Sequence, residues 1–317
     1  MKELYSPIYK LVSSFQNNNI YIKREDQIPL SFGGNKARKA SLFFQDIKKK
    51  EADCIVTYGS GSSNHCRIVS NMAAANKIKC VIISPEEEYE NTFNSTMMEL
   101  FGAKICMCSV LNVKETINKV LEELKSRGMN PYFIQGGGHG NLGTQAYVNA
   151  YDEIVEWEIK NKIKFDYIFH ASGTGTTQAG LICGQLQRMD YWRKIIGISI
   201  ARKEIRGKQI IAESIESYMG NQQNIDLQKY ILFDDQFTGD GYGKTTENIN
   251  DLIEELLINE TIPLDSTYTG KAFYGMRERV QKDGIQGKNI LFIHTGGTPL
   301  FYDWLCRKRV KKCILNI

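Results

Sequence analysis

The sequence predicts an α/β protein whose mostly parallel sheets are covered by helices on both faces. Short apolar segments of strand length alternate with longer segments in which apolar residues recur at the helical spacing. Many of the 27 glycines follow predicted strands directly, where the loops of open α/β sheets approach ligands closely. These glycines are Gly59, Gly61, Gly136, Gly137, Gly138, Gly140, Gly143, Gly173, Gly175, Gly296 and Gly297. We therefore expect one ligand site built from several strand ends.

The first half of the chain contains four predicted strands separated by three predicted helices. The strands are Cys54–Tyr58, Lys79–Ser84, Lys104–Met107 and Tyr132–Ile134. The helices are His65–Asn76, Thr92–Phe101 and Val113–Arg127. In the last helix, the apolar residues that keep the helical period are Ile117, Val120, Leu121 and Leu124. Gly128 ends this helix and Pro131 introduces the next strand.

The second half repeats the same alternation. Its predicted strands are Tyr167–His170, Ile195–Ser199 and Asn289–His294. Its predicted helices are Thr144–Lys160, Gln178–Arg188, Thr246–Ile258 and Tyr268–Lys282. All four histidines stand in or beside the glycine-rich loops that follow the strands. This placement reinforces the expectation of a single site at the strand ends.

Composition excludes several classes of protein. At 317 residues and 42% hydrophobic content, the chain is long enough for one large or two medium domains with a buried core. The net charge of +4 requires no nucleic-acid partner. No apolar run reaches the roughly 18 residues of a membrane span, and the N-terminus lacks the apolar segment of a signal peptide. The eight cysteines include no CxxC pair, so we expect reduced thiols in the cytoplasm and no metal site.

The segment Ser172–Thr177 (SGTGTT) lies between a predicted strand and a predicted helix. Its small residues expose backbone N–H groups, its hydroxyls donate hydrogen bonds, and the helix start adds partial positive charge, which together suit a phosphate dianion. A purely structural tight turn is the alternative. The dinucleotide pattern GxGxxG is incomplete because Gln178 occupies its third glycine position, and the basic Arg202 and Lys203 stand where an acidic ribose partner is expected. An NADP-type site is weakened but not excluded.

Two further segments carry candidate chemistry. Lys36 follows a glycine pair at the start of a helix, and a desolvated lysine can form a Schiff base with an aldehyde. A solvated surface lysine is the alternative. With a phosphate loop elsewhere in the chain, the natural aldehyde is pyridoxal 5′-phosphate (PLP). The segment 62–65 (SSNH) opens a helix, where it serves as an N-cap, as a binding site for a substrate α-carboxylate, or as both.

Seven motifs, in the same order along nearly the whole chain, carry a resemblance to a known family. They are IYIKREDQIPLSFGGNKARK, GSSNHCR, GGGHGNLGTQAY, ASGTGTTQAGL, DDQFTGDGYG, PLDSTYTGKAFYG and LFIHTGGTPLFY. The sequence resembles the fold-type II PLP enzymes and, within them, the D-cysteine desulfhydrase / 1-aminocyclopropane-1-carboxylate (ACC) deaminase family. The resemblance implies two α/β domains with the cofactor in the cleft between them. The large domain would comprise residues 1–37 plus 146–317, and the small domain residues 38–145.

The resemblance also implies roles for individual residues. Lys36 would be the Schiff-base lysine, assisted in catalysis by Ser63 and Tyr268. Substrate would be bound by Ser63, Asn64, His65, Tyr242 and Tyr268. Cofactor would be bound by Asn35, Lys36, Asn64, Gly173, Thr174, Gly175, Thr176, Thr177 and Thr295. In this assignment the Thr295 hydroxyl bonds the pyridine nitrogen, so that the ring is left neutral.

The implied activity is α,β-elimination from a small D-amino acid such as D-cysteine, giving pyruvate, ammonia and sulfide. Thr269 favours this reaction over ACC ring opening, because ACC deaminases resemble this segment but carry Glu after the tyrosine. The family usually has Gln where Ser62 stands, and LDS replaces its LDP, which leaves the substrate open. ACC deamination, another PLP lyase or β-replacement reaction, and PLP binding without turnover are the alternatives. The family also implies a homodimer that acts on a small amino acid without nucleic-acid or membrane partners.

Overall fold

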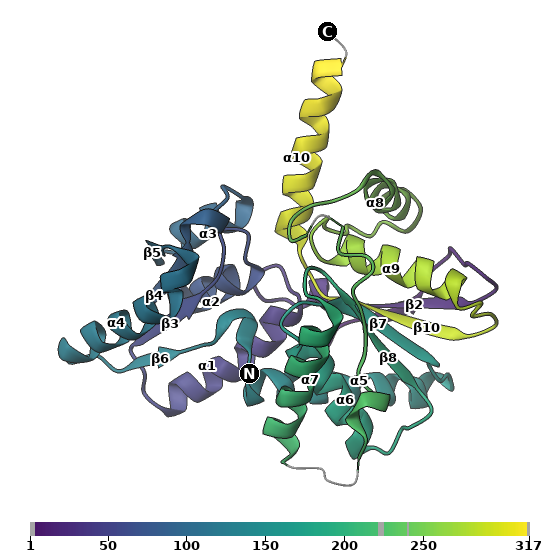
Figure 1. The fold of residues 1–317 in the computed structure, drawn as a ribbon, viewed down its shortest axis with the longest axis horizontal. Coiled ribbons are helices and arrows are strands. Elements are labelled where there is room, and N and C mark those ends of the chain that lie inside the picture. The colour runs from purple at the N-terminus through teal and green to yellow at the C-terminus, as the bar shows by residue number, and fades with distance from the viewer. Residues whose placement is uncertain (1–3, 221–224, 240, 316–317) are drawn as a thin grey trace.

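The computed structural model describes residues 4–220, 225–239 and 241–315. It contains two sheets. The first has six strands in the order β1-β2-β10-β7-β8-β9, and only the β1–β2 pair is antiparallel. The second has four strands in the order β5-β4-β3-β6, all parallel. Figure 1 shows the two sheets side by side, with β3–β6 on the left and the six-stranded sheet on the right. The predicted α/β class with mostly parallel sheets is confirmed.

The strands of the larger sheet are β1 (Ile8–Lys10), β2 (Asn19–Arg24), β7 (Tyr167–Ser172), β8 (Lys194–Ser199), β9 (Leu232–Asp234) and β10 (Asn289–His294). Those of the smaller sheet are β3 (Cys54–Tyr58), β4 (Lys79–Pro85), β5 (Lys104–Cys108) and β6 (Pro131–Phe133). The helices are α1 (Asn35–Lys49), α2 (Asn64–Ala75), α3 (Phe93–Leu100), α4 (Val113–Ser126), α5 (Asn141–Asn161), α6 (Thr176–Gln187), α7 (Glu204–Met219), α8 (Glu247–Glu260), α9 (Thr269–Lys282) and α10 (Thr298–Leu315).

Helices cover both faces of the larger sheet, as the continuous apolar strands predicted. Along β10, Ile290 and Phe292 enter one apolar core with α8 and α9, while Leu291 and Ile293 enter another with α5, α6 and α7. Successive residues of a strand point to opposite faces, so a strand buried on both sides must be apolar at nearly every position. The smaller sheet is likewise buried on both faces, with α1, α2 and α3 on one side and α4 on the other.

Two predicted helix starts need correction, and glycine is the reason in both. The helix predicted from Thr144 begins at Asn141, directly after Gly140 with φ of 113°. The helix predicted from Gln178 begins at Thr176, because Gly175 takes the left-handed conformation at its N-cap. A glycine before a helix permits the sharp turn that ends the preceding loop. The helices α1, α7 and α10 and the strands β1, β2 and β9 were not delimited from the sequence.

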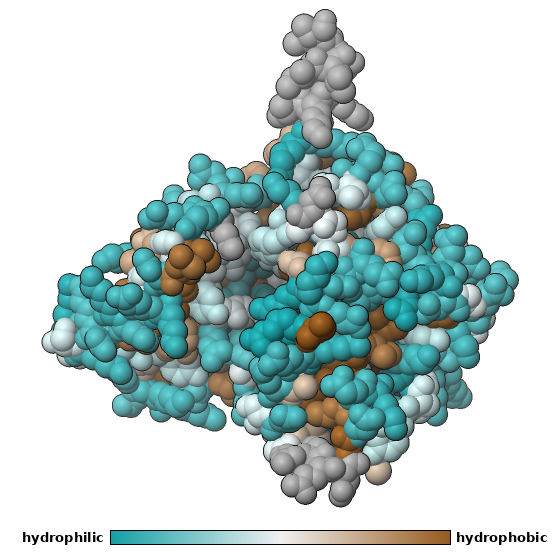
Figure 2. Space-filling model, viewed as in Figure 1, coloured by the Kyte–Doolittle hydropathy of each residue, from teal (hydrophilic) through white to brown (hydrophobic). Residues whose placement is uncertain are grey.

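The predicted domain boundaries lie inside helices. Residue 37 falls within α1 and residue 146 within α5, so each helix would be shared between the two predicted domains. The strands themselves fall on the expected sides, since the smaller sheet lies within 54–133. The division into two domains stays a prediction. Figure 2 shows the molecular surface hollowed between the two parts.

Candidate active site

One cavity of about 380 Å³ gathers most of the predicted site residues. It lies where the carboxyl ends of β3, β7, β8 and β10 meet, so both sheets contribute to it. The predicted residues that line it are Asn35, Lys36, Ser63, Asn64, His65, Gly173, Thr174, Tyr242, Tyr268 and Thr295. Gly175, Thr176 and Thr177 are not among the lining residues. The cavity thus lies at the strand ends where the sequence predicts a ligand site, and ligand binding there stays a prediction.

Lys36 lies in the first turn of α1, at the wall of this cavity. The turn is reached through Gly33 and Gly34, whose φ angles of 64° and 99° favour glycine. The Lys36 ammonium donates to the Gly137 carbonyl at 2.9 Å, and no carboxylate among the described residues forms an ion pair with it. Desolvation, and then the nearby charge of Arg202, lowers the pKa of Lys36 to about 8. The amine is therefore partly neutral near pH 7, as a nucleophile must be.

The loop after β7 presents a set of unpaired backbone donors. Within the described structure, the N–H groups of residues 173–177 donate to no protein acceptor. Thr176 and Thr177 are buried; the Thr176 hydroxyl pairs with His139 Nδ1 at 2.8 Å, and Thr177 accepts from Asn35 Nδ2 at 3.1 Å. Buried N–H groups need an acceptor, and a helix N-terminus favours an anion. The loop thus fits a phosphate group held by backbone, and Asn35 ties it to the lysine helix.

Ser63, Asn64 and His65 begin α2 at the opposite wall of the cavity. Ser63 is the N-cap, and its Oγ accepts from Cys66 N at 3.2 Å, which leaves the hydroxyl proton free to donate. His65 Nε2 lies 2.9 Å from Thr57 Oγ1, whose own proton goes to the Ile134 carbonyl. Nε2 therefore carries the imidazole hydrogen. Burial, with the charges of Lys36 and Lys39, lowers the pKa of His65, so the ring is neutral.

Two tyrosines meet on the third side of the cavity. The hydroxyls of Tyr242 and Tyr268 are hydrogen-bonded to each other, and their rings pack edge to face. Burial, and then the neighbouring Tyr242, raises the pKa of Tyr268 well above its usual value, so its proton stays on. The loop that carries Tyr242 is held by Lys271 of α9, which donates to the carbonyls of Thr238 and Gly241 at 2.9 and 2.6 Å.

Thr295 and Thr269 differ sharply in position. Thr295 lines the cavity, and its hydroxyl makes no hydrogen bond within the described structure. Thr269 is fully buried and does not line the cavity. Its hydroxyl donates to Asp265 Oδ2 at 2.7 Å and accepts from Asp265 N at 2.9 Å. The Thr269 side chain therefore holds Asp265 at the start of α9 and does not reach the cavity. The choice of elimination over ACC ring opening that the sequence draws from this position stays a prediction.

Comparison with known proteins assigns the family. A family model described as pyridoxal-phosphate dependent enzyme matches residues 3–296. The chain belongs to this family. A D-cysteine desulfhydrase of Serratia proteamaculans (strain 568) is 33% identical over 310 residues, covering 94% of this chain and 93% of that protein. A D-cysteine desulfhydrase of Klebsiella pneumoniae (strain 342) is 31% identical over 308 residues, covering 92% and 91%.

Solved structures agree with the fold. An ACC deaminase homologue is 30% identical, with a TM-score of 0.82 over 96% of this chain and 93% of that one. A hydrogen sulfide-producing enzyme from Fusobacterium nucleatum has a TM-score of 0.68 at 17% identity, covering 92% and 95%. At that identity the likeness supports the fold alone. The protein is thus a PLP-dependent enzyme with the fold-type II architecture, as the motifs predicted.

The cavity of this PLP-dependent enzyme includes residues that the sequence did not single out. Tyr58 ends β3, and Arg202 follows β8; both line the cavity. Arg202 was noticed only as an obstacle to a dinucleotide site. Gly137 has φ of 70°, and a Cβ there would lie 2.6 Å from the Thr174 methyl and 3.2 Å from Lys36 Nζ. The glycine motif GGGHG was the only available signal for this contact.

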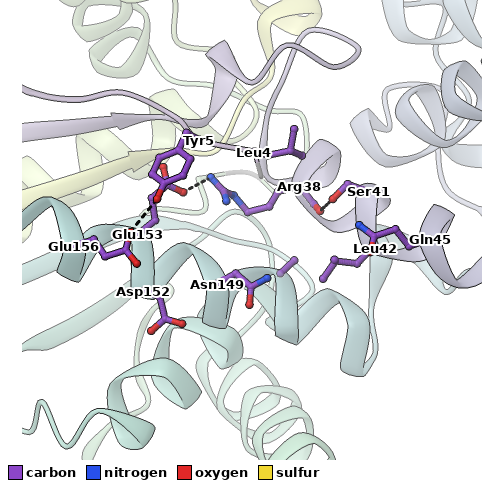
Figure 3. A pocket seen from close by; sticks show the side chains of 11 residues that line it. Leu4, Tyr5, Arg38, Ser41, Leu42, Gln45, Asn149, Asp152, Glu153 and Glu156 are labelled. Carbon is purple, nitrogen blue, oxygen red and sulfur yellow. Dashed lines mark hydrogen bonds and ion pairs between the residues drawn. The ribbon is translucent and has the colours of Figure 1, made fainter. Parts of the chain in front are cut away.

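A second cavity, of about 480 Å³, lies against α1 and α5 (Figure 3). Its charged groups are paired. Arg38 donates to Glu25 at 2.7 Å and to Glu153 at 2.8 Å, and Lys23 donates to Glu153 at 2.6 Å. Tyr5 donates to Glu156 at 2.9 Å. None of the predicted site residues lines this cavity.

Among the described residues, no helix is both long and apolar enough to cross a membrane.

Proposed function

We propose that the smaller cavity is the active site of a lyase that eliminates the β-substituent of a small amino acid, with D-cysteine as the first substrate to test. One observation carries the proposal. A single cavity of about 380 Å³ is lined by an amine without an acidic partner among the described residues, by Gly173 and Thr174 at the start of the loop of unpaired N–H groups, and by a polar helix start. The names of the relatives, D-cysteine desulfhydrase and ACC deaminase homologue, support this class of reaction.

The residues fit the cofactor as follows. When bound, PLP supplies an electron sink for the bond that breaks at the substrate Cα. Lys36 would attach its aldehyde, and the N–H groups of Gly173–Thr177 would hold its phosphate. The Thr295 hydroxyl would meet the ring nitrogen. Asn64 would meet the oxygen at the ring 3′ position, the substrate carboxylate, or both.

Proton transfer is assigned to groups whose protonation the cavity sets. Lys36, with a pKa lowered to about 8, can take the Cα proton as a neutral amine. Tyr268 keeps its proton because burial raises its pKa, and it can donate to the leaving sulfur or orient the substrate. Ser63 can donate its hydroxyl proton to the substrate carboxylate, because its oxygen already accepts from Cys66 N. His65 is fixed as a neutral ring that orients this wall.

The reaction balances with water as the one co-reactant. The Cα–H and Cβ–S bonds break, and sulfur leaves with the bonding electron pair and takes up a proton. The released enamine gains a proton at Cβ and loses one from nitrogen, and water hydrolyses the resulting imine carbon. D-Cysteine and water thus give pyruvate, ammonia and hydrogen sulfide, with no change in overall oxidation state. No external oxidant or reductant is required.

The deciding experiment measures sulfide and pyruvate from D- and L-cysteine with PLP-loaded protein. We expect both products in equal amounts from D-cysteine, and a yellow protein whose absorbance is lost in Lys36→Ala. Formation of 2-oxobutanoate from ACC would replace the proposal by the deaminase. Products from L-cysteine alone would reverse the stereochemistry. PLP binding without turnover of any of these would support a binding protein.

Three further expectations from the family belong to the same proposal. The protein is a homodimer, it works in the cytoplasm, and its large domain (1–37 plus 146–317) and small domain (38–145) close over the substrate. Light scattering after size-exclusion chromatography tests the dimer. Limited proteolysis with and without D-alanine tests domain closure, for which we expect slower cleavage when the amino acid is bound.

A further inference from the structure

The first turn of α3 lies directly behind the α2 start that lines the cavity. Asn94, in this turn, is completely buried. Its side-chain Nδ2 donates to the Ser62 carbonyl at 2.9 Å and to Asn64 Oδ1 at 3.0 Å. Thr92, two residues earlier, donates from its hydroxyl to the Gly61 carbonyl at 3.0 Å. The turn therefore holds the segment 61–64 from behind.

These contacts fix which way each amide faces. A backbone carbonyl can only accept, so Asn94 must turn its NH₂ group toward Ser62. The same NH₂ group meets Asn64, so Asn64 must turn its oxygen toward Asn94. The Asn64 NH₂ group is then the half that remains, and within the described structure it has no hydrogen-bond partner. Since Asn64 lines the cavity, this group is a free donor at the cavity wall.

The remaining atom of Asn94 points to the same conclusion. Asn94 Oδ1 is buried and has no hydrogen-bond partner among the residues that the structure describes. Burying an unpaired oxygen costs free energy, so the Asn94 amide is not a fully satisfied core group. What it does supply is two donated hydrogen bonds, and both go to the loop that ends in Asn64.

We propose that Asn94 is a positioning residue that locks Asn64 with its NH₂ group toward the cavity, where it donates to an oxygen anion of the bound ligand. The inference deepens the proposed function and rests on it for the identity of that ligand. The oxygen belongs either to the cofactor, at its 3′ position, or to the carboxylate of the amino acid. Without Asn94, the Asn64 amide can rotate and present its carbonyl oxygen, which repels both.

Two substitutions at position 94 separate polarity from packing. Asn94→Asp keeps the shape but replaces the donor by an acceptor at pH 8, so Asn64 is drawn to rotate its NH₂ group away from the cavity. Asn94→Leu removes the hydrogen bonds without reversing them. A packing role predicts that Leu does more harm than Asp, whereas the polarity role predicts the opposite. Thr92→Val is the matched control. It removes a hydrogen bond from the same turn to the same loop, together with the N-cap bond from Ser95 N, without touching Asn64.

The readouts are two equilibrium titrations that need no turnover. One follows PLP binding to cofactor-free protein, and the other follows the absorbance change of PLP-loaded protein on adding D-alanine or L-alanine, which lack a leaving group. We expect at least one dissociation constant to rise about tenfold in Asn94→Leu, the effect of one lost hydrogen bond, and about a hundredfold in Asn94→Asp. Thr92→Val should stay within about threefold.

The pattern of loss identifies the oxygen. A rise confined to the PLP titration assigns the donor to the 3′ oxygen, and a rise confined to the alanine titration assigns it to the carboxylate. Unchanged constants in both variants, a larger loss in Leu than in Asp, or an equal loss in Thr92→Val would overturn the proposal. If Asn94→Asp does not fold, Asn94→Leu against Thr92→Val decides alone. Failure of wild-type protein to eliminate from any substrate would overturn the proposed reaction but leave both titrations readable.

Discussion

Lys36 and Arg38 stand two residues apart on the first turn of α1, yet their side chains lie in opposite electrostatic surroundings. Arg38 forms buried ion pairs with Glu25 and Glu153, which also pair with Lys23. We call these four residues the buried charge network. Lys36 points into the smaller cavity, where its nearest partner is the neutral Gly137 carbonyl. The paired carboxylate Glu25 has its pKa lowered to about 2 by Arg38 and Lys23, against the opposing effect of burial.

The difference between these regions teaches how one helix can carry both stability and reactivity. A buried charge is tolerated when its partners compensate for lost hydration, and then its protonation is fixed over the physiological range. A buried amine without a charged partner lowers its pKa and becomes reactive. Substitutions in the buried charge network should therefore change the free energy of unfolding, and substitutions in the cavity around Lys36 should change ligand binding. The predictions that follow test this separation.

The largest effect on stability is expected in the buried charge network. Arg38→Met leaves Glu25 and Glu153 buried with one cation fewer, which should lower the free energy of unfolding by about 3–5 kcal/mol. Lys36→Met should lower it by less than about 1 kcal/mol while abolishing PLP attachment. Urea unfolding of the cofactor-free proteins measures both. Arg188→Met, which breaks the exposed pair with Asp152, is the control and should cost about 1 kcal/mol or less. Equal destabilisation by Arg38→Met and Lys36→Met would contradict the separation.

The next effect concerns the floor of the cavity. Gly137→Ala forces a side chain into the left-handed region and places a methyl group against Thr174 and Lys36 Nζ. We expect PLP binding to weaken by about 2 kcal/mol, roughly thirtyfold. Gly128→Ala is the control, because its φ of 77° is similar but a Cβ there would meet no described atom within 4 Å. It should cost about 1 kcal/mol of stability and leave PLP affinity unchanged. Similar PLP affinities for the two variants would show that contact with Lys36 is unimportant.

The two regions also differ in how far the sequence reveals them. The strand Asn289–His294 was delimited correctly because its four central positions are all apolar, as expected of a strand that is buried on both faces. The strand β2 was missed because its NIYIKR sequence ends in two cations. Both cations are buried with carboxylate partners: Glu25 and Asp26 lie close by in the sequence, but only the fold brings the distant Glu153 to Lys23. Pairing between distant residues leaves no local signal.

In the cavity, the sequence identified residues that stand in distinctive loops and missed a residue that contacts the cavity wall from behind. Lys36 and residues 173–177 stand out by their glycines and hydroxyls, so chemistry could be predicted for them. Asn94 lies in a helix without any motif, and its contacts depend on α3 packing against the α2 start. For Thr269 the motif gave the position but not the side-chain contact with Asp265, because a motif does not show the direction of a side chain.

A smaller effect tests the lowered pKa of Lys36, which has no carboxylate partner among the described residues. The neutral amine attacks an aldehyde, and a pKa lowered to about 8 means that the neutral fraction rises only about tenfold between pH 7 and pH 9. For an ordinary lysine it rises about a hundredfold over the same range. Stopped-flow absorbance of PLP attachment to cofactor-free protein measures the rise. An N-acetyl-lysine amide reference corrects for ionisation of PLP. A rise as steep as that of the reference would mean that Lys36 is not desolvated.

The smallest effect is expected at Ser62, where the family usually has Gln. Ser62 Oγ lies 3.1 Å from Ser60 Oγ and 3.4 Å from the Tyr242 hydroxyl, so a longer side chain there extends toward the tyrosine side of the cavity. Ser62→Gln should change the KM for the amino acid about threefold, the effect of one weak hydrogen bond, and leave PLP affinity and unfolding midpoint unchanged. Ser62→Ala separates loss of the hydroxyl from gain of the amide. Because no charge is compensated at this wall, substitutions there should alter substrate choice without altering stability; a lower unfolding midpoint in Ser62→Ala would extend the stabilising network into the cavity.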